Sequence, residues 1–138
     1  KVSQPIIDRI DICVEATPLS FDEISSASAN ETSEDIRKRV ISCHEIQKKR
    51  YAGETFLYNS KITTDKLEKY CHLNKREQSY MENMYEKLGL TARTYHKILK
   101  VARTIADLES CEDIKTKHLN EAICYRSINE KFWGGACG

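Results

Sequence analysis

One stretch decides the fold: Leu88-Gly89-Leu90-Thr91-Ala92-Arg93-Thr94-Tyr95-His96-Lys97-Ile98-Leu99-Lys100-Val101-Ala102-Arg103-Thr104-Ile105-Ala106-Asp107-Leu108. Its apolar residues recur at steps of three and four, which places them on one face of an α-helix. They are Tyr95, Ile98, Leu99, Ala102, Ile105 and Ala106. Gly89 is expected to end the preceding helix, and Thr91 to serve as N-cap, with Leu90 and Tyr95 as a hydrophobic staple. Over the opposite face we expect Arg93, Lys97, Lys100 and Arg103 to fan out.

Arg93 is the unusual residue of this stretch. It falls at the second helical position, where free backbone N–H groups and the positive end of the helix dipole favour an anion and disfavour a cation. Two interpretations remain open at this point. Most arginines in a first helical turn are simply solvated, whereas a guanidinium beside unpaired N–H donors also describes a phosphate-binding corner.

The composition is that of a foldable, soluble domain. The chain has 138 residues, of which 31% are charged and 40% hydrophobic, with a formal charge of +1. This charge gives no general attraction to nucleic acid or to a membrane, and no apolar run is long enough to span a bilayer. Because the chain begins at Lys1 without an initiator Met or a signal peptide, we expect a fragment of a longer cytoplasmic protein.

The six cysteines are expected to be reduced thiols. They are Cys13, Cys43, Cys71, Cys111, Cys124 and Cys137, and no two of them form a C-x-x-C pair. Cys71 and His72 are the one adjacent pair of metal-ligand types. Without a second pair at metal spacing, we expect no metal site.

The N-terminal third predicts a strand, a linker and a helix. Ile10, Ile12 and Val14 alternate with polar residues across residues 9–15, a pattern typical of a strand whose partners lie upstream or in another chain. Residues 17–33 are rich in Ser, Thr, Ala and acidic residues, which indicates a flexible linker. Thr32 and Asp35 then form a candidate capping box for a helix from residue 34.

The helix that follows the linker has an apolar seam and basic flanks. Its seam is predicted to be Ile36, Val40 and Cys43. Its basic residues are Arg37, Lys38, Arg39, Lys48, Lys49 and Arg50. They are interpreted either as a solvated face, with the last-turn cations complementing the helix dipole, or as a contact for DNA or another polyanion.

Three more helices are expected beside those already described. Thr63 or Thr64 begins a short one that ends at Cys71. Asn74 caps the next, with Glu77 completing the cap and a core face of Tyr80, Met81, Met84, Tyr85 and Leu88. Thr116 caps the last, whose Leu119, Ala122 and Ile123 pack inward. The prediction is an all-α bundle of four or five helices over residues 34–131, preceded by one orphan β-strand and the flexible linker, and followed by a frayed tail over 132–138.

Four segments resemble motifs of the magnesium-chelatase-type AAA+ ATPases, closest to the YifB/ComM branch of magnesium-chelatase-like competence proteins. Ser3-Gln4-Pro5-Ile6-Ile7-Asp8-Arg9-Ile10-Asp11 is similar to S-G-P-L-L-D-R-[IF]-D, except that Gln4 replaces the usual glycine. The others are Ile36-Arg37-Lys38-Arg39-Val40 with Gln47 and Arg50-Tyr51; the stretch 88–108; and His118-Leu119 with Glu121-Ala122 and Tyr125-Arg126. The resemblance covers nearly the whole chain.

The resemblance implies a role in ATP hydrolysis. Residues 1–16 would end an ATPase core, and residues 34–131 would form its C-terminal helical lid. Arg9 would be an arginine finger that acts in trans on a neighbouring subunit, and Arg93 the sensor-II arginine that contacts the nucleotide of its own subunit. ATP and Mg²⁺ would be bound by the full-length protein in a hexameric ring, and single-stranded or branched DNA would be the substrate of the motor. This chain has no phosphate loop, so alone it should be inactive.

Two alternatives to the ATPase lid remain. One is a helical module that binds DNA or a protein without any ATPase role. The other is a subunit of a metal chelatase that inserts magnesium into a porphyrin, for which no tetrapyrrole-facing residue can be named.

Overall fold

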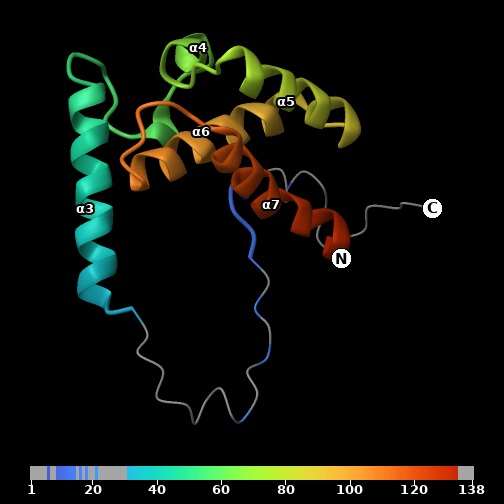
Figure 1. Cartoon of the computed structure of the whole chain (residues 1–138), viewed down its shortest axis with the longest axis horizontal. Helices are drawn as coiled ribbons and strands as arrows, with labels where there is room; N and C mark the ends of the chain where they lie inside the picture. Colours follow the sequence, from blue (N-terminus) through green and yellow to red (C-terminus); the bar gives the residue numbers. More distant parts are fainter. Residues whose placement is uncertain are drawn as a thin grey trace.

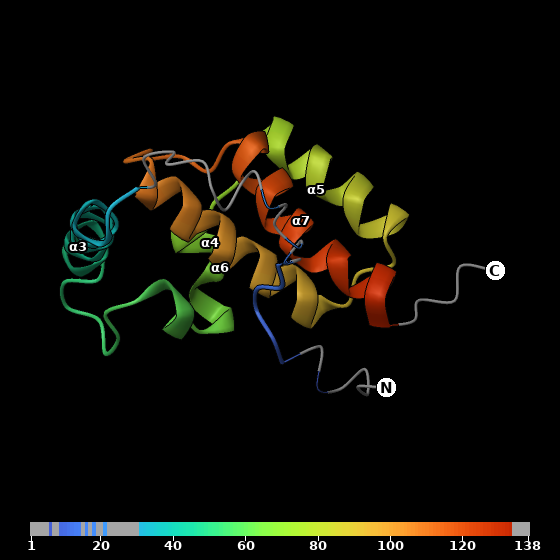
Figure 2. The same cartoon turned by 90° about the horizontal axis from the view of Figure 1, so that it is seen from below.

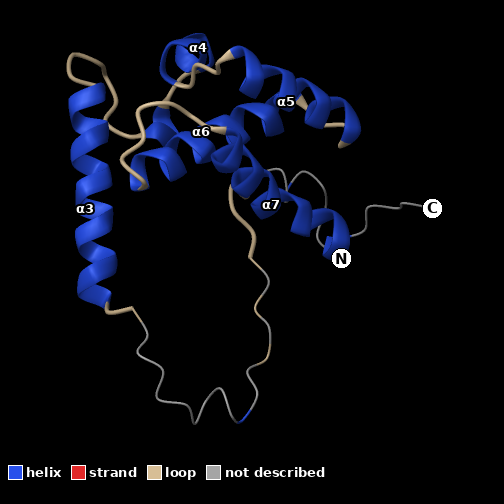
Figure 3. Ribbon diagram, in the orientation of Figure 1, coloured by secondary structure: helices blue, strands red, loops and turns tan. Residues whose placement is uncertain are grey.

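Five α-helices and two short 3₁₀ turns make up the described part of the computed structural model, which covers residues 6, 9–14, 16, 18, 21 and 31–133, with side chains described as far as residue 126. In chain order they are α3 (Ser33–Arg50), η1 (Asn59–Lys61), η2 (Thr64–Lys66), α4 (Leu67–Tyr70), α5 (Lys75–Lys87), α6 (Ala92–Leu108) and α7 (Thr116–Trp133). Within these residues no strand is formed (Figure 3). The all-α class that the sequence predicts is confirmed.

Helix α6 lies at the centre of the bundle. It packs against α7, against the C-terminal half of α3 and against η1, and α7 in turn packs against α5. The two views show α5, α6 and α7 grouped together, while α3 stands to one side as an arm (Figures 1 and 2). The predicted stretch 88–108 is therefore the element on which the others are assembled.

The start of α6 follows the sequence prediction closely. Gly89 adopts φ +55°, in the left-handed region that glycine enters without a Cβ penalty. The hydroxyl of Thr91 accepts a hydrogen bond of 3.2 Å from the backbone N–H of Thr94, which confirms Thr91 as the N-cap. Thr32 caps α3 in the same way through the N–H of Asp35, at 3.2 Å.

The hydrophobic core is built around the apolar face of α6. Ile98, Leu99, Ala102, Ile105 and Ala106 are all buried. The side chains packed around them come from α4, α5, α7 and the segments between the helices, and include Tyr51, Ile62, Leu67, Cys71, Met81, Ile114, Leu119, Ala122 and Ile123. The core faces that the sequence predicts for α5 and α7 are confirmed at Met81, Leu119, Ala122 and Ile123, each at most 4% exposed.

Two predicted caps differ from the structure. Asn74 occupies the N-cap of α5, but its side chain makes no capping hydrogen bond. Glu77 does not complete that cap, because its carboxylate accepts a 3.0 Å hydrogen bond from the hydroxyl of Thr116. Thr116 is the first residue of α7 rather than its cap, and its hydroxyl joins α7 to α5.

The predicted strand over residues 9–15 is wrong for the residues described, 9–14, which form no strand. The segment lies instead against α7, where the N–H of Cys13 donates to the carbonyl oxygen of Tyr125 at 3.0 Å. The physical reason is the one that makes a lone strand unstable: the described part of the chain offers no second strand to pair with it.

The predicted apolar seam of α3 is only partly buried. Cys43 is 3% exposed, whereas Ile36 and Val40 are 43% and 40% exposed. Residues 33–42 are all exposed, and the contacts of α3 with the bundle lie in its C-terminal half. Most of the predicted linker, and residues 134–138 of the predicted tail, lie outside the described residues; the backbone of α7 is helical as far as Trp133.

Candidate functional site

Arg93 lies exposed at the second position of α6. The first intrahelical hydrogen bond of this helix runs from the N–H of Tyr95 to the carbonyl of Thr91, at 2.9 Å, and the N–H of Thr94 is taken by the Thr91 hydroxyl. The N–H groups of Ala92 and Arg93 therefore have no intrahelical acceptor. The guanidinium of Arg93 makes no hydrogen bond or ion pair with any residue that the structure describes. These groups together form a corner suited to an anion such as phosphate.

Packing holds the first turn of α6 in place. The Tyr95 ring meets the Tyr85 ring of α5 edge-on at 6.0 Å between centroids, and the centroid of the His96 ring lies 5.9 Å from that of Tyr95. Leu90 and Tyr95 are both half-buried and pack against the core. Burial raises the pKa of Tyr95. The backbone that presents Arg93 is thus fixed by aromatic contacts rather than left to fray.

Arg9 is also exposed and lies in the segment that crosses α6 and α7. Its N–H donates to the carbonyl of Ile6 at 3.0 Å. Two residues further on, Asp11 forms an ion pair of 2.6 Å with Lys97, which lies one turn after Arg93 on α6. The structure therefore connects the segment of Arg9 to the helix of Arg93 through one ion pair.

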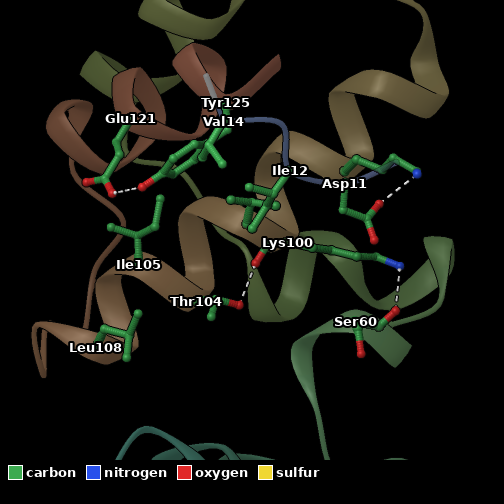
Figure 4. Close-up of a pocket in the computed structure, with 12 residues that line it drawn as sticks. Asp11, Ile12, Val14, Ser60, Lys100, Thr104, Ile105, Leu108, Glu121 and Tyr125 are labelled. Carbon is green, nitrogen blue, oxygen red and sulfur yellow. Dashed lines mark hydrogen bonds and ion pairs between the residues drawn. The ribbon is translucent and has the colours of Figure 1, made fainter. Parts of the chain in front are cut away.

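A groove of about 600 Å³ lies beside this connection. Figure 4 shows Ile12 and Val14 on one side, Ile105 and Leu108 of α6 beneath them, and Tyr125 of α7 next to Val14 with its hydroxyl toward Glu121. Its polar rim includes Lys100, whose ammonium approaches the carbonyl of Ser60 at 3.5 Å. The remaining lining residues are Asp11, Lys97, Val101, Thr104 and Glu121. The groove is mostly apolar and one of its walls is the N-terminal segment itself.

Near the C-terminal end of α6, the carboxylate of Asp107 is fully buried and accepts hydrogen bonds from three side chains. Arg50 of α3 donates through both terminal nitrogens, at 2.7 Å and 2.5 Å. Arg103 donates through Nε at 3.1 Å, and Asn59 of η1 through Nδ2 at 2.8 Å. Arg103 also donates to the carbonyls of Cys111 and Glu112, at 2.6 Å each. One carboxylate thereby joins α3, η1, α6 and the loop before α7.

Asn59 extends this buried network toward α3. Its N–H donates to the Gln47 side chain at 3.0 Å, and its amide oxygen accepts from the hydroxyl of Tyr51. Burial raises the pKa of Tyr51 to about 12, so the phenol stays a neutral donor. The sequence analysis did not predict this network. One part of it could have been predicted, because Arg103 and Asp107 are four residues apart on one helix, a spacing that favours an ion pair.

Two predicted basic positions need correction. Arg103 does not fan out into solvent, since it is 4% exposed and closes the loop before α7. Arg50 is not free to contact a polyanion, because both of its terminal nitrogens bind Asp107. In each case a buried carboxylate turns the cation inward, and this cannot be read from helical spacing.

The other basic residues of α3 are largely balanced by acids. Lys38 pairs with Glu34 at 3.0 Å, Arg39 with Glu31 at 2.5 Å and Lys48 with Glu45 at 2.6 Å. Of the six predicted contacts, Arg37 and Lys49 are the two that form no ion pair with a described residue. The face is therefore less cationic than its sequence suggests.

One group of potential metal ligands lies at the other end of α6: Glu109, Cys111 and His118, whose ligand atoms fall within 4.8 Å of one another. The buried imidazole of His118 accepts a 3.0 Å hydrogen bond from the N–H of Lys115 at Nδ1. Its proton is therefore on Nε2, which lies 3.1 Å from the Glu109 carboxylate and donates to it. A metal at Nε2 would need that proton removed, so the geometry fits a helix cap better than a metal site.

A comparison with protein families identifies the bundle. The family model described as magnesium chelatase, subunit ChlI C-terminal, matches residues 30–126. The chain belongs to this family. The matched residues run from before α3 to Arg126 and include Arg93 and the Asp107 network, while Arg9 lies before them.

Curated relatives agree with this assignment. The chain is 37% identical to competence protein ComM of Haemophilus influenzae over 93% of its own length. It is 38% and 33% identical, over 94% of its length, to the uncharacterized YifB proteins of Salmonella typhimurium and Escherichia coli. It spans 25% of the length of each of these relatives. Among the described residues, no helix has the length and apolar character needed to cross a membrane.

Proposed function

We propose that this chain is the nucleotide-sensing helical lid of a ring-forming AAA+ ATPase that works in the cytoplasm. The observation that carries the proposal is the start of α6, where an exposed Arg93 lies beside free N–H groups on a helix end fixed by packing. Membership of the chelatase ChlI C-terminal family supports it. An upstream core of the same polypeptide holds ATP and Mg²⁺, and Arg93 contacts a phosphate of that ATP.

Arg9 has the complementary role in this proposal. Its guanidinium reaches the nucleotide of a neighbouring subunit and neutralises charge that develops on the transferred phosphoryl group. Arg9 acts in trans while Arg93 acts in cis, so each ATP is contacted by arginines of two subunits. The energy of hydrolysis is converted into movement of the lid.

The motor is proposed to act on single-stranded or branched DNA. The name of the Haemophilus relative, a competence protein, favours this over porphyrin metallation, which the family name alone suggests. A DNA-binding module without ATPase activity is the weaker candidate, because most cations of α3 are already paired with acids or buried.

The test is ATP turnover by the complete polypeptide that carries this chain. Arg93→Ala should lower turnover at least tenfold, since it removes a charged hydrogen bond, and Arg93→Lys should recover only part of the loss because an ammonium lacks the planar fork. Arg76→Ala is the matched control, because Arg76 is exposed at the same second position of α5. Turnover of Arg93→Ala equal to that of Arg76→Ala would overturn the sensor role.

A further inference from the structure

The segment before the bundle is held on α6 and α7 by three polar contacts. The N–H of Cys13 donates to the carbonyl of Tyr125 at 3.0 Å. The guanidinium of Arg126 donates to the carbonyl of Ile10. The carboxylate of Asp11 pairs with Lys97 at 2.6 Å. Backbone and side chain are thus both anchored within four consecutive residues that directly follow Arg9.

One partner of the ion pair, Lys97, is shielded from water. The Lys97 side chain is 18% exposed, although that of Asp11 is 61% exposed. Ile12 and Val14, which follow, line the groove over α6 together with Val101 and Ile105 (Figure 4). The low exposure of the Lys97 side chain and the apolar surroundings reduce screening by water, which strengthens the pair relative to a fully solvated one.

Arg126 is a costly residue to bury without a purpose. It is 8% exposed and forms no ion pair with any carboxylate among the described residues, and its Nε has no acceptor there. A buried cation without a counter-ion destabilises a fold unless its donors are used. Its hydrogen bond to the carbonyl of Ile10 is made to the residue that immediately follows Arg9.

We propose that Lys97 and Arg126 are positioning residues that hold Arg9 on the lid, so that the two arginines assigned to phosphate move as one unit. Lys97 follows Arg93 by one turn, about 6 Å along the helix. A shift of α6 caused by nucleotide at Arg93 is then passed through Asp11 to Arg9. This inference rests on the proposed function and adds the link by which one subunit's nucleotide state reaches the site of its neighbour.

The anchoring is tested on this chain by amide hydrogen exchange. Lys97→Asp places two carboxylates together, and Asp11→Lys places two ammonium groups together, so each should speed exchange of the Cys13 amide about fivefold. The double variant Asp11→Lys/Lys97→Asp, in which the two charges are swapped, should return the exchange rate of the Cys13 amide to within about twofold of the parent. The amide of Ile98, in the core of α6, reports whether the fold itself is weakened.

Lys87→Asp is the control for charge reversal, because Lys87 is an exposed lysine of α5 that forms no ion pair with a described residue. It should leave the Cys13 amide unchanged. Equal Cys13 exchange in the parent and in both single variants would overturn the anchoring.

The link to Arg9 is tested by turnover of the complete polypeptide. The single charge reversals should lower kcat several-fold with unchanged KM for ATP, and the double variant with swapped charges should restore kcat. Arg126→Lys should keep more activity than Arg126→Ala, because it retains a donor for Ile10. Unchanged kcat in the single variants, with turnover abolished in Arg9→Ala, would overturn the positioning role and leave the proposed function standing. Turnover that survives both Arg9→Ala and Arg93→Ala would instead refute the proposed function, whatever the exchange rates.

Discussion

Arg50 and Asp107 lie 57 residues apart in the sequence and form a bidentate ion pair between α3 and α6, with N–O distances of 2.7 Å and 2.5 Å. The Asp107 side chain is fully buried and that of Arg50 is 19% exposed. Because Arg103 and Asn59 bind the same carboxylate, Asp107 is the point at which α3 is fastened to the bundle.

Asp107→Asn should destabilise the chain by about 3–5 kcal/mol, because two guanidinium groups would be left without their shared counter-ion. The free energy of unfolding in urea measures this. Asp113→Asn is the control, since Asp113 is exposed and pairs only with Lys115 at the surface, and it should cost under about 1 kcal/mol. A loss of less than about 1 kcal/mol for Asp107→Asn would show that the network does not fasten α3.

Glu54 should make stability depend on acid pH. Its carboxylate binds Lys66 and the hydroxyl of Tyr70, and Lys69 also contributes, which lowers its pKa from 4.5 to about 2. The unfolded chain then binds more protons than the folded chain between these values. The contribution is fully present above pH 4.5 and is lost as the pH falls toward 2.

Unfolding midpoints in urea from pH 6 to pH 2 check this expectation. The parent should lose stability over this interval more steeply than Glu54→Gln. Glu86→Gln, which changes an exposed glutamate without an ion pair to the described residues, should follow the parent. Parallel curves for the parent and Glu54→Gln would contradict the assigned pKa.

Two helix caps should differ in strength although both were predicted from sequence. Thr91→Ala removes a formed hydrogen bond to the N–H of Thr94 and should cost about 1 kcal/mol. Asn74→Ala removes a side chain that makes no capping bond and should cost clearly less. The free energy of unfolding in urea, measured for both variants, tests this difference. Equal losses of stability would mean that the Asn74 side chain does cap α5.

The sequence could predict those features of the fold that depend on neighbouring residues, and could not predict those that depend on residues far apart in the chain. The helix over 92–108 and its cap Thr91 follow from local spacing, and both are confirmed. The inward turn of Arg103 could not be predicted, because its partners include carbonyls of the loop at residues 111 and 112. The exposure of Ile36 follows from the placement of α3, which depends on the distant pair of Arg50 and Asp107.

For the candidate site too, features set by local sequence could be predicted and features set by distant contacts could not. The position of Arg93 at a helix start could be predicted, since it needs only the cap and the helix that follows. The contact of Asp11 with Lys97 could not, because residues 9–15 read as a strand and the docking of this segment is a tertiary effect. The roles of both Arg93 and Arg9 in nucleotide binding remain predictions.

If α3 is the element that contacts single-stranded DNA, binding should depend only weakly on salt. Arg37 and Lys49 are the basic residues of α3 left without an ion pair to described residues, and two phosphate contacts give a slope of log K against log salt of about −1.4. Titrations by fluorescence anisotropy at several salt concentrations measure the slope. A slope of −4 or steeper would favour a direct DNA-binding role for this helix.

The most direct test of the central claim is the affinity of the complete polypeptide for ATP and for ADP. If Arg93 contacts the terminal phosphate, Arg93→Ala should weaken ATP binding about tenfold or more and leave ADP binding within about threefold, as expected for one charged hydrogen bond. Arg76→Ala should change neither affinity. Equal weakening of ATP and ADP would place the contact on a phosphate that both nucleotides carry, whereas no weakening of either nucleotide would contradict the account.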